Sequence, residues 1–300
     1  MPGAMPIAII YISFIEPFNS MTGAVWKLSR RSERFRRCWI FKAFALYFPA
    51  RLHRTVELQP TRKYVFGYHP HGIICHGAFL AFGTDALDFS RLFPGITNVF
   101  LTLDSNFCVP LYREYILSLG LGGVSGDSCR KILSNGGHDG NGMGRAITIA
   151  VGGARESLLA TPGTMRLLLR DRKGFIKLAI EEGADLVPVL GFGENCLYYQ
   201  KNITHRSSRL LKLQLCMKNM LGWTAPMFRG RSPWGGPGLM PYRKPLDIVV
   251  GRPIEVAQCF NPDGEYVDLV HKRYMDEIER MWNEWKDIVP GDAPVQLEFV

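Results

Sequence analysis

Residues 64–72 read Tyr-Val-Phe-Gly-Tyr-His-Pro-His-Gly and join a short apolar run to two histidines. Four more runs of that apolar, mostly β-branched kind follow, at residues 98–103, 146–151, 186–192 and 246–250. Continuous apolar strands are typical of a sheet that is buried on both faces. Helical stretches separate several of them. The alternation predicts an α/β fold with a mainly parallel sheet flanked by helices.

Helical patterns follow the later strands. Phe175–Glu182 ends at Gly183, a residue that favours a helix C-terminus. Residues 266–288 place apolar side chains at helical spacing and predict an amphipathic helix on the core. Residues of about 200–245 interrupt the alternation of strands and helices, and we expect a helical insertion followed by a long loop there. The domain of residues 53–300 would contain this insertion.

Composition narrows the class of protein. The chain has 300 residues, of which 47% are hydrophobic, and a formal charge of +9. That is enough apolar material for a core, and the charge predicts an anionic partner: nucleic acid, a membrane surface or a phosphate-bearing molecule. The seven cysteines are scattered without a CxxC pair, which favours a reducing compartment.

The N-terminal 52 residues form a separate segment in this interpretation. Residues 7–15 are apolar but too short to span a bilayer as a helix. A basic cluster (Lys27, Arg30, Arg31, Arg34, Arg36 and Arg37) and an aromatic segment at residues 39–49 follow. We expect a membrane anchor with the basic cluster on anionic headgroups. The alternative is a helix packed on the body with a solvated basic face.

The predicted strands deliver polar residues at their carboxyl ends, where open α/β sheets form their sites. The first strand is followed by His69, Pro70, His71 and Gly72, and later strands by Asp104, by residues 152–157 and by residues 193–195. Two histidines, two acids and a glycine-rich turn would therefore meet at one edge. A histidine there suits a general base near neutral pH, and the rival interpretation is a metal site on His69 and His71.

The turn at Gly152 and Gly153 exposes backbone N–H groups that suit an oxyanion or a phosphate. Cationic residues follow, among them Arg172, Lys173 and Lys177. They are either a phosphate site or a solvated helix face. The chain has neither a P-loop nor a GxSxG nucleophile elbow, which argues against an NTPase and a serine hydrolase. Nucleic-acid binding would explain the charge but not the histidine pair.

Four blocks in this order resemble the type-2 diacylglycerol acyltransferase family, with its monoacylglycerol acyltransferases and wax synthases. The similar region runs from about residue 38 to 288. The blocks are Tyr47-Phe48-Pro49, His69-Pro70-His71-Gly72, Gly152-Gly153-Ala154-Arg155-Glu156, and a final block from Arg172 through Val187-Pro188 to Phe192-Gly193-Glu194-Asn195.

The resemblance implies a glycerol-phosphate-acyltransferase-like fold and acyl transfer from acyl-CoA, a co-substrate, with no cofactor. The expected acceptor is diacylglycerol, giving triacylglycerol. Alternative acceptors are a monoacylglycerol, a fatty alcohol or the hydroxyl of a specialised metabolite. An alternative function of a different class is that of a membrane-bound metallohydrolase. It also implies the endoplasmic reticulum membrane, with lipid droplets left open, a catalytic domain facing the cytosol, no nucleic-acid partner and no metal. A homo-oligomer is left open.

Roles follow for the site residues. His71 would be the base, His69 would support it, and Glu156 would hold its tautomer or cation. The related HxxxxD motif has its acid five residues after the histidine, but here that position is His76, so Glu156 and Asp104 are the candidates for an orienting acid. The residues expected to bind substrate are Gly72, Asp104, Gly152, Gly153, Arg172, Lys173, Lys177, Glu194 and Asn195. Residues 234–237 depart from the family's pattern.

Overall fold

A seven-stranded sheet forms the centre of the computed structural model, which describes residues 28–200, 228–289 and 296–300. The strand order is β1-β11-β7-β2-β5-β3-β4. The strands are β1 (Arg51–Arg54), β2 (Lys63–His69), β3 (Thr97–Thr102), β4 (Gly122–Gly123), β5 (Arg145–Ala150), β7 (Ala184–Phe192) and β11 (Asp247–Val250).

The predicted α/β class is confirmed, with one change of direction in the sheet. All pairs are parallel except β11 with β7, so the sheet is mixed. The central strands β2 and β7 are almost wholly buried, as their continuous apolar runs predicted. β1 includes residues 51 and 52, so the end of the N-terminal segment belongs to the sheet.

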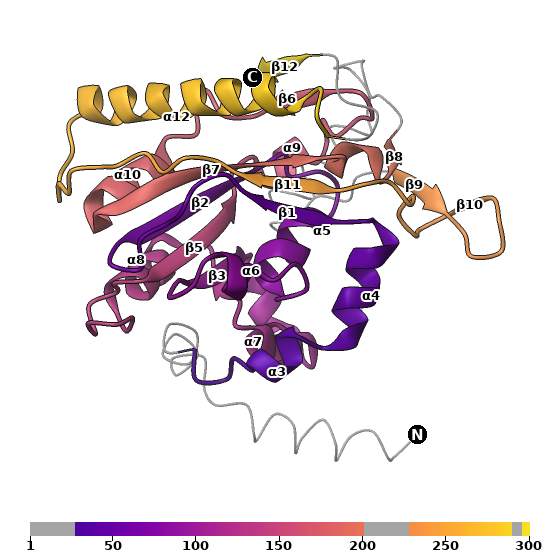
Figure 1. Cartoon of the computed structure of the whole chain (residues 1–300), viewed down its shortest axis with the longest axis horizontal. Coiled ribbons are helices and arrows are strands. Elements are labelled where there is room, and N and C mark those ends of the chain that lie inside the picture. The colour runs from indigo at the N-terminus through magenta and orange to yellow at the C-terminus, as the bar shows by residue number, and fades with distance from the viewer. Residues whose placement is uncertain (1–27, 201–227, 290–295) are drawn as a thin grey trace.

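Helices cover both faces of the sheet (Figure 1). α12 (Gly264–Trp285) and α10 (Gly174–Glu182) pack against β7, and Gly183 ends α10 in a left-handed conformation, both as predicted. The opposite face carries α5 (His76–Ala78), the π-helical turn η1 (Phe79–Gly83), α6 (Phe89–Leu92) and α7 (Tyr112–Leu119). α8 (Gly126–Ser134) packs against β5 and α10. Three further short helical turns are η2 (Asp104–Cys108), α9 (Gly153–Glu156) and η3 (Glu194–Cys196).

Two small sheets lie outside the central one. β8 (Tyr199–Gln200), β9 (Phe228–Arg231) and β10 (Pro237–Gly238) form an antiparallel sheet. The second half of the expected insertion is therefore a β-hairpin and not the long loop that we predicted. Its predicted helical half, residues 201–227, lies outside the described residues. β6 (Met165–Leu167) pairs in parallel with β12 (Leu297–Phe299).

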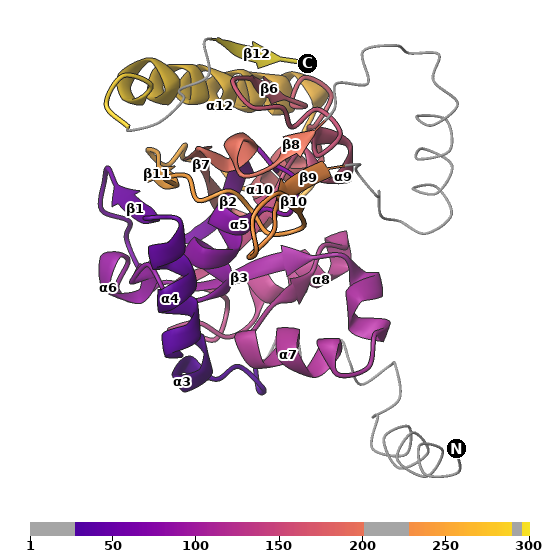
Figure 2. The same cartoon turned by 90° about the vertical axis from the view of Figure 1, so that its right-hand side faces the viewer.

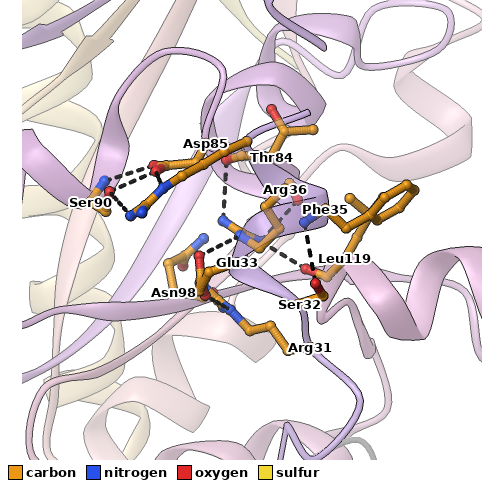
Figure 3. A network of polar contacts seen from close by, with 12 residues as sticks. Arg31, Ser32, Glu33, Phe35, Arg36, Thr84, Asp85, Ser90, Asn98 and Leu119 are labelled. Atoms are coloured by element: carbon orange, nitrogen blue, oxygen red, sulfur yellow. Dashed lines mark hydrogen bonds and ion pairs between the residues drawn. The ribbon is translucent and has the colours of Figure 1, made fainter. Parts of the chain in front are cut away.

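The N-terminal helices α3 (Glu33–Arg36) and α4 (Trp39–Tyr47) are joined to the body by a buried arginine (Figure 3). The Arg36 guanidinium donates to the carbonyls of Gly83, Leu119 and Thr84 at 2.8–3.1 Å, and to that of Phe82 at 3.4 Å. Burial lowers its pKa to about 10, still far above neutral pH.

The basic cluster is therefore not a uniform lipid-facing patch, and the prediction is corrected for several of its members. Arg36 is buried, Arg31 donates to Glu33 and to the Asn98 carbonyl, and Arg37 pairs with Asp85 at 2.8 Å. The apolar run of residues 7–15 and Lys27 lie outside the described residues. No helix in the described ranges is long and apolar enough to cross a membrane.

Candidate active site

The turn after β2 places the two histidines in different surroundings. Strand alternation would put residues 69 and 71 on the same face, but β2 ends at His69 and the alternation does not extend to His71. His69 is fully buried under α12, where its Nε2 lies 3.0 Å from the Tyr274 hydroxyl. His71, beyond Pro70, is partly buried and lines a cavity on the α5 face. The predicted pair is thus split between the two sides of the sheet.

The His71 ring has one defined tautomer. Its Nδ1 lies 3.1 Å from the carbonyl oxygen of Gly72. Because a carbonyl oxygen only accepts hydrogen bonds, Nδ1 carries the proton and Nε2 keeps its lone pair. Burial lowers the pKa of His71 below its ordinary value of 6.5, so the ring is neutral at pH 7. His71 therefore has the form that a general base requires.

Glu156 holds the backbone of His71 and not its ring, which corrects the role that we predicted. Its Oε1 accepts from the His71 N–H at 2.6 Å, and its Oε2 accepts from the Leu168 N–H at 2.8 Å. Burial raises the pKa of Glu156 to about 7, while the two N–H donors act in the opposite direction. Gly152 is needed for this packing, because a Cβ there would meet the Glu156 carboxylate at 2.1 Å.

Glu194 organises the start of α5 and was expected instead to bind substrate. Its carboxylate is 1% exposed and accepts from the N–H groups of His76 and Gly77 and from the Tyr68 hydroxyl, each at 2.8 Å. A Cβ at Gly72, where φ is +61°, would meet the Glu194 side chain at 2.5 Å. Gly72 and Glu194 are therefore positioning residues of the histidine turn.

The remaining predicted acids and amides lie away from the His71 ring. Asp104 is exposed at the start of η2 and does not line the cavity, so it does not orient His71. The Gly72 carbonyl does this instead. Asn195 is buried and donates through Nδ2 to the Thr164 carbonyl at 2.9 Å. These positions make Asn195 structural and leave Asp104 outside the site.

The cavity beside His71 is large and mainly apolar, with a volume of about 550 Å³. Gly153 of α9 lines it, as do side chains of α4, η1, β3 and α7 that the sequence did not single out. Among them are Phe44, Phe79, Phe100, Tyr112, Tyr115 and Ile116. Cys75 also lines it, but burial raises the pKa of its thiol well above the usual value, so it is no thiolate nucleophile. Such a cavity suits an acyl chain.

A second, basic cavity of about 490 Å³ adjoins the first, because Val124 and Ile149 line both. Arg172 and Lys177 line it, as does Arg130 of α8, which sequence reasoning missed. The N-terminal residues of α8 and α10 also reach this cavity, and helix N-termini favour anions. Lys173 does not line it and pairs with Asp268 at 2.6 Å. The described residues contain no group of three or more potential metal ligands.

Comparisons with known proteins agree with this geometry. A family model described as diacylglycerol acyltransferase matches residues 5–299. The chain belongs to the diacylglycerol acyltransferase family. Its residues 47–49, 69–72, 152–156 and 172–195 are the blocks that carried the resemblance, and the expectation of this family is confirmed. No solved structure matches the chain significantly.

Similar curated proteins of the diacylglycerol acyltransferase family come from fungi and animals. The chain is 42% identical to diacylglycerol O-acyltransferase 1 of Schizosaccharomyces pombe over 284 residues, which cover 94% of this chain and 79% of that protein. It is 45% identical to diacylglycerol O-acyltransferase 2A of Umbelopsis ramanniana, with 87% and 72% covered. It is 43% identical to 2-acylglycerol O-acyltransferase 1 of Mus musculus, with 82% and 72% covered.

Proposed function

We propose that the chain transfers the acyl group of acyl-CoA to the free hydroxyl of diacylglycerol, with His71 as the general base. The observation that carries this proposal is the His71 ring, with its proton fixed on Nδ1 by the Gly72 carbonyl and its unprotonated Nε2 beside the apolar cavity. An alcohol has a pKa far above 7 and needs such a base.

The reaction then proceeds without a covalent enzyme intermediate. The acceptor hydroxyl gives its proton to His71 Nε2 while its oxygen attacks the thioester carbonyl carbon. The C–S bond breaks as the C–O ester bond is completed. The CoA thiolate leaves and takes the proton from His71, which restores the neutral ring. Gly153 lines the cavity, and its backbone is our candidate for contact with the oxyanion.

The two adjoining cavities suit the two ends of acyl-CoA. The apolar cavity would hold the acyl chain, and the basic one would hold the phosphates against Arg130, Arg172 and Lys177. The thioester would lie near Val124 and Ile149, which line both. The Arg172 guanidinium supports this assignment, because it has no ion-pair partner within 4 Å among the described residues. Arg130 and Lys177, in contrast, share Glu181.

A transfer assay tests the proposal. The full chain in lipid vesicles is given labelled acyl-CoA with diacylglycerol, 2-monoacylglycerol or a fatty alcohol, and the His71→Ala variant serves as the control. We expect the highest rate with diacylglycerol and triacylglycerol as the product. Faster transfer to monoacylglycerol would assign that acceptor instead, and no transfer to any acylglycerol would overturn the proposal.

We propose the endoplasmic reticulum membrane as the location, with the catalytic domain facing the cytosol, where acyl-CoA is available. The free cysteines of the described residues support a reducing compartment on the catalytic side. Protease protection of microsomes from cells that express the chain tests the orientation. Complete digestion of the domain in intact microsomes is expected, and protection would place it in the lumen.

A further inference from the structure

The β9–β10 hairpin carries a feature that acyl transfer does not explain. Trp234 in its turn is 94% exposed, and Leu239, directly after β10, is 77% exposed. Large exposed apolar side chains on one hairpin mark a contact with another surface. Residues 234–237 are also the part of the chain that departs from the family's pattern.

Backbone hydrogen bonds give this tip a defined shape. Arg231 and Met240 exchange N–H···O bonds of 2.8 and 3.0 Å, and the Ser232 N–H donates to the Gly236 carbonyl at 3.0 Å. Gly235 and Gly236, with φ of +90° and +80°, supply the left-handed turn. Trp234 is therefore held outward by an ordered turn.

The charge around the tip identifies its partner. Residues 228–246 include Arg229, Arg231 and Arg243 and no acidic residue. Arg229 lies 5.8 Å from the ring centre of Tyr199, which is itself half exposed. Cationic side chains beside an exposed tryptophan match the interface of an anionic bilayer, where phosphates meet acyl chains. A second copy of the chain, docked symmetrically, would bring like charges together.

The hairpin also lies beside the wall of the acyl cavity. The Tyr47 hydroxyl at the end of α4 donates to the Pro241 carbonyl at 2.7 Å, and Arg243 Nε donates to the Tyr47 carbonyl at 3.1 Å. α4 lines the cavity with Phe44 and also exposes Trp39, Ile40 and Leu46. Figure 2 shows α4, α7 and the hairpin on one side of the molecule.

We propose that the β9–β10 hairpin is a membrane contact of its own, in which Trp234 and Leu239 enter the headgroup region of an anionic bilayer. Arg229, Arg231 and Arg243 bind lipid phosphates beside them. This contact turns the side that carries α4 toward the lipid, so that a lipid acceptor reaches the cavity without crossing water. The inference rests on the proposed function only for this last step.

Depth-dependent fluorescence quenching tests the contact directly. The full chain is reconstituted into phosphatidylcholine vesicles with and without phosphatidylserine, and brominated lipid is the quencher. The chain has six tryptophans, so the signal of Trp234 is the difference between wild type and Trp234→Phe. We expect brominated lipid to quench that difference signal, whereas an aqueous quencher should reach it poorly. The reverse pattern would overturn the proposal.

Kinetics provide the second readout. Trp234→Ala with Leu239→Ser should raise the KM for vesicle-borne diacylglycerol about tenfold, because two interfacial apolar side chains are lost. The kcat with a short-chain diacylglycerol in detergent should not change. Phe260→Ala is the matched control: Phe260 is 84% exposed, and the segment before α12 lies at the opposite end of the molecule from β10 (Figure 1).

Three outcomes separate the possibilities. Equal effects of the hairpin and Phe260 variants, or an unchanged KM, would overturn the membrane contact. A change of oligomeric state in detergent, without a change in quenching or KM, would assign the hairpin to contacts between copies. A wild type that is inactive in both vesicles and detergent would refute the proposed function, whereas the quenching result would still decide the contact.

Discussion

At the scale of single residues, the state of His71 is set by one carbonyl oxygen. The Gly72 carbonyl fixes the proton on Nδ1, and burial keeps the ring neutral. His69 is the opposite case, because its Nε2 is occupied by Tyr274 and burial lowers its pKa to about 3. Of two histidines that are separated by one proline, one therefore packs in the core, and the other is the base that we propose.

Replacing each histidine should separate these roles. His71→Ala should reduce kcat by about 10²- to 10⁴-fold, the usual contribution of a general base, at an unchanged melting temperature. His69→Ala should instead lower the melting temperature, since it leaves a void and removes one of the two hydrogen bonds of the Tyr274 hydroxyl. Steady-state kinetics and thermal unfolding of both variants provide the check. Wild-type turnover by well-folded His71→Ala would refute the base assignment.

The pH dependence of the rate follows from the same burial. A base must be unprotonated to act, so activity rises with pH through its pKa. Since the pKa of His71 is lowered, the ascending limb of the kcat/KM profile should lie on the acid side of 6.5. A limb centred above 6.5 in the wild type would contradict this environment for the ring.

At the scale of elements, Glu156 and Glu194 connect the chain segments that build the site. Each accepts backbone N–H groups from the turn or helix after β2, although Glu156 follows β5 and Glu194 follows β7. Their sequence positions at strand ends predicted that they would be near the histidines. They did not predict the partner, because contact with a ring or with a backbone N–H depends on the path of both chains.

The Glu156→Gln variant tests this positioning role. An amide NH₂ replaces one acceptor oxygen and then faces an N–H donor at His71 or Leu168. We expect kcat to fall at least about tenfold with an unchanged KM for acyl-CoA, by the loss of geometry at the base. The pH of the ascending limb should stay in place. A limb that moves or disappears would instead make Glu156 part of the proton transfer.

Arg130 of α8 and Arg172, two residues before α10, are far apart in sequence and line the same cavity. Arg130→Gln with Arg172→Gln should raise the KM for acyl-CoA and make that KM less sensitive to salt, because screened phosphate contacts are lost. The KM for diacylglycerol should not change. Lys173→Gln, at the neighbouring position but outside the cavity, is the control. If Lys173→Gln raised the KM for acyl-CoA as much as the double variant, the result would argue against a local phosphate site.

At the scale of the whole molecule, strands and helices could be predicted because each one is a local pattern. The direction of β11 could not, since its short apolar run Ile248–Val250 reads the same in either direction. Tyr274 is 205 residues from His69, and no local signal connects them. The basic cluster misled because a run of arginines has the same composition whether it is solvated or, like Arg36, buried against carbonyl oxygens.

Arg36 joins the N-terminal helices to the sheet layer, so its loss should affect the fold globally. Arg36→Ala leaves several buried carbonyls without a donor, each at about 1–3 kcal/mol. We expect the free energy of unfolding to fall by more than about 3 kcal/mol, measured by denaturant titration. Arg36→Lys keeps the charge but loses the planar guanidinium group. Its free energy of unfolding should lie between those of the wild type and Arg36→Ala. A loss below about 1 kcal/mol for Arg36→Ala would show that other contacts hold these helices.

The pairing of β6 with β12 makes residues 297–299 more important than their distance in sequence from the site suggests. Leu297–Phe299 runs beside Met165–Leu167, and Val300 N–H donates to the Leu167 carbonyl at 2.8 Å. The next residue, Leu168, is the one that shares Glu156 with His71. Removing residues 297–299 would take away a strand whose neighbour supports the base that we propose.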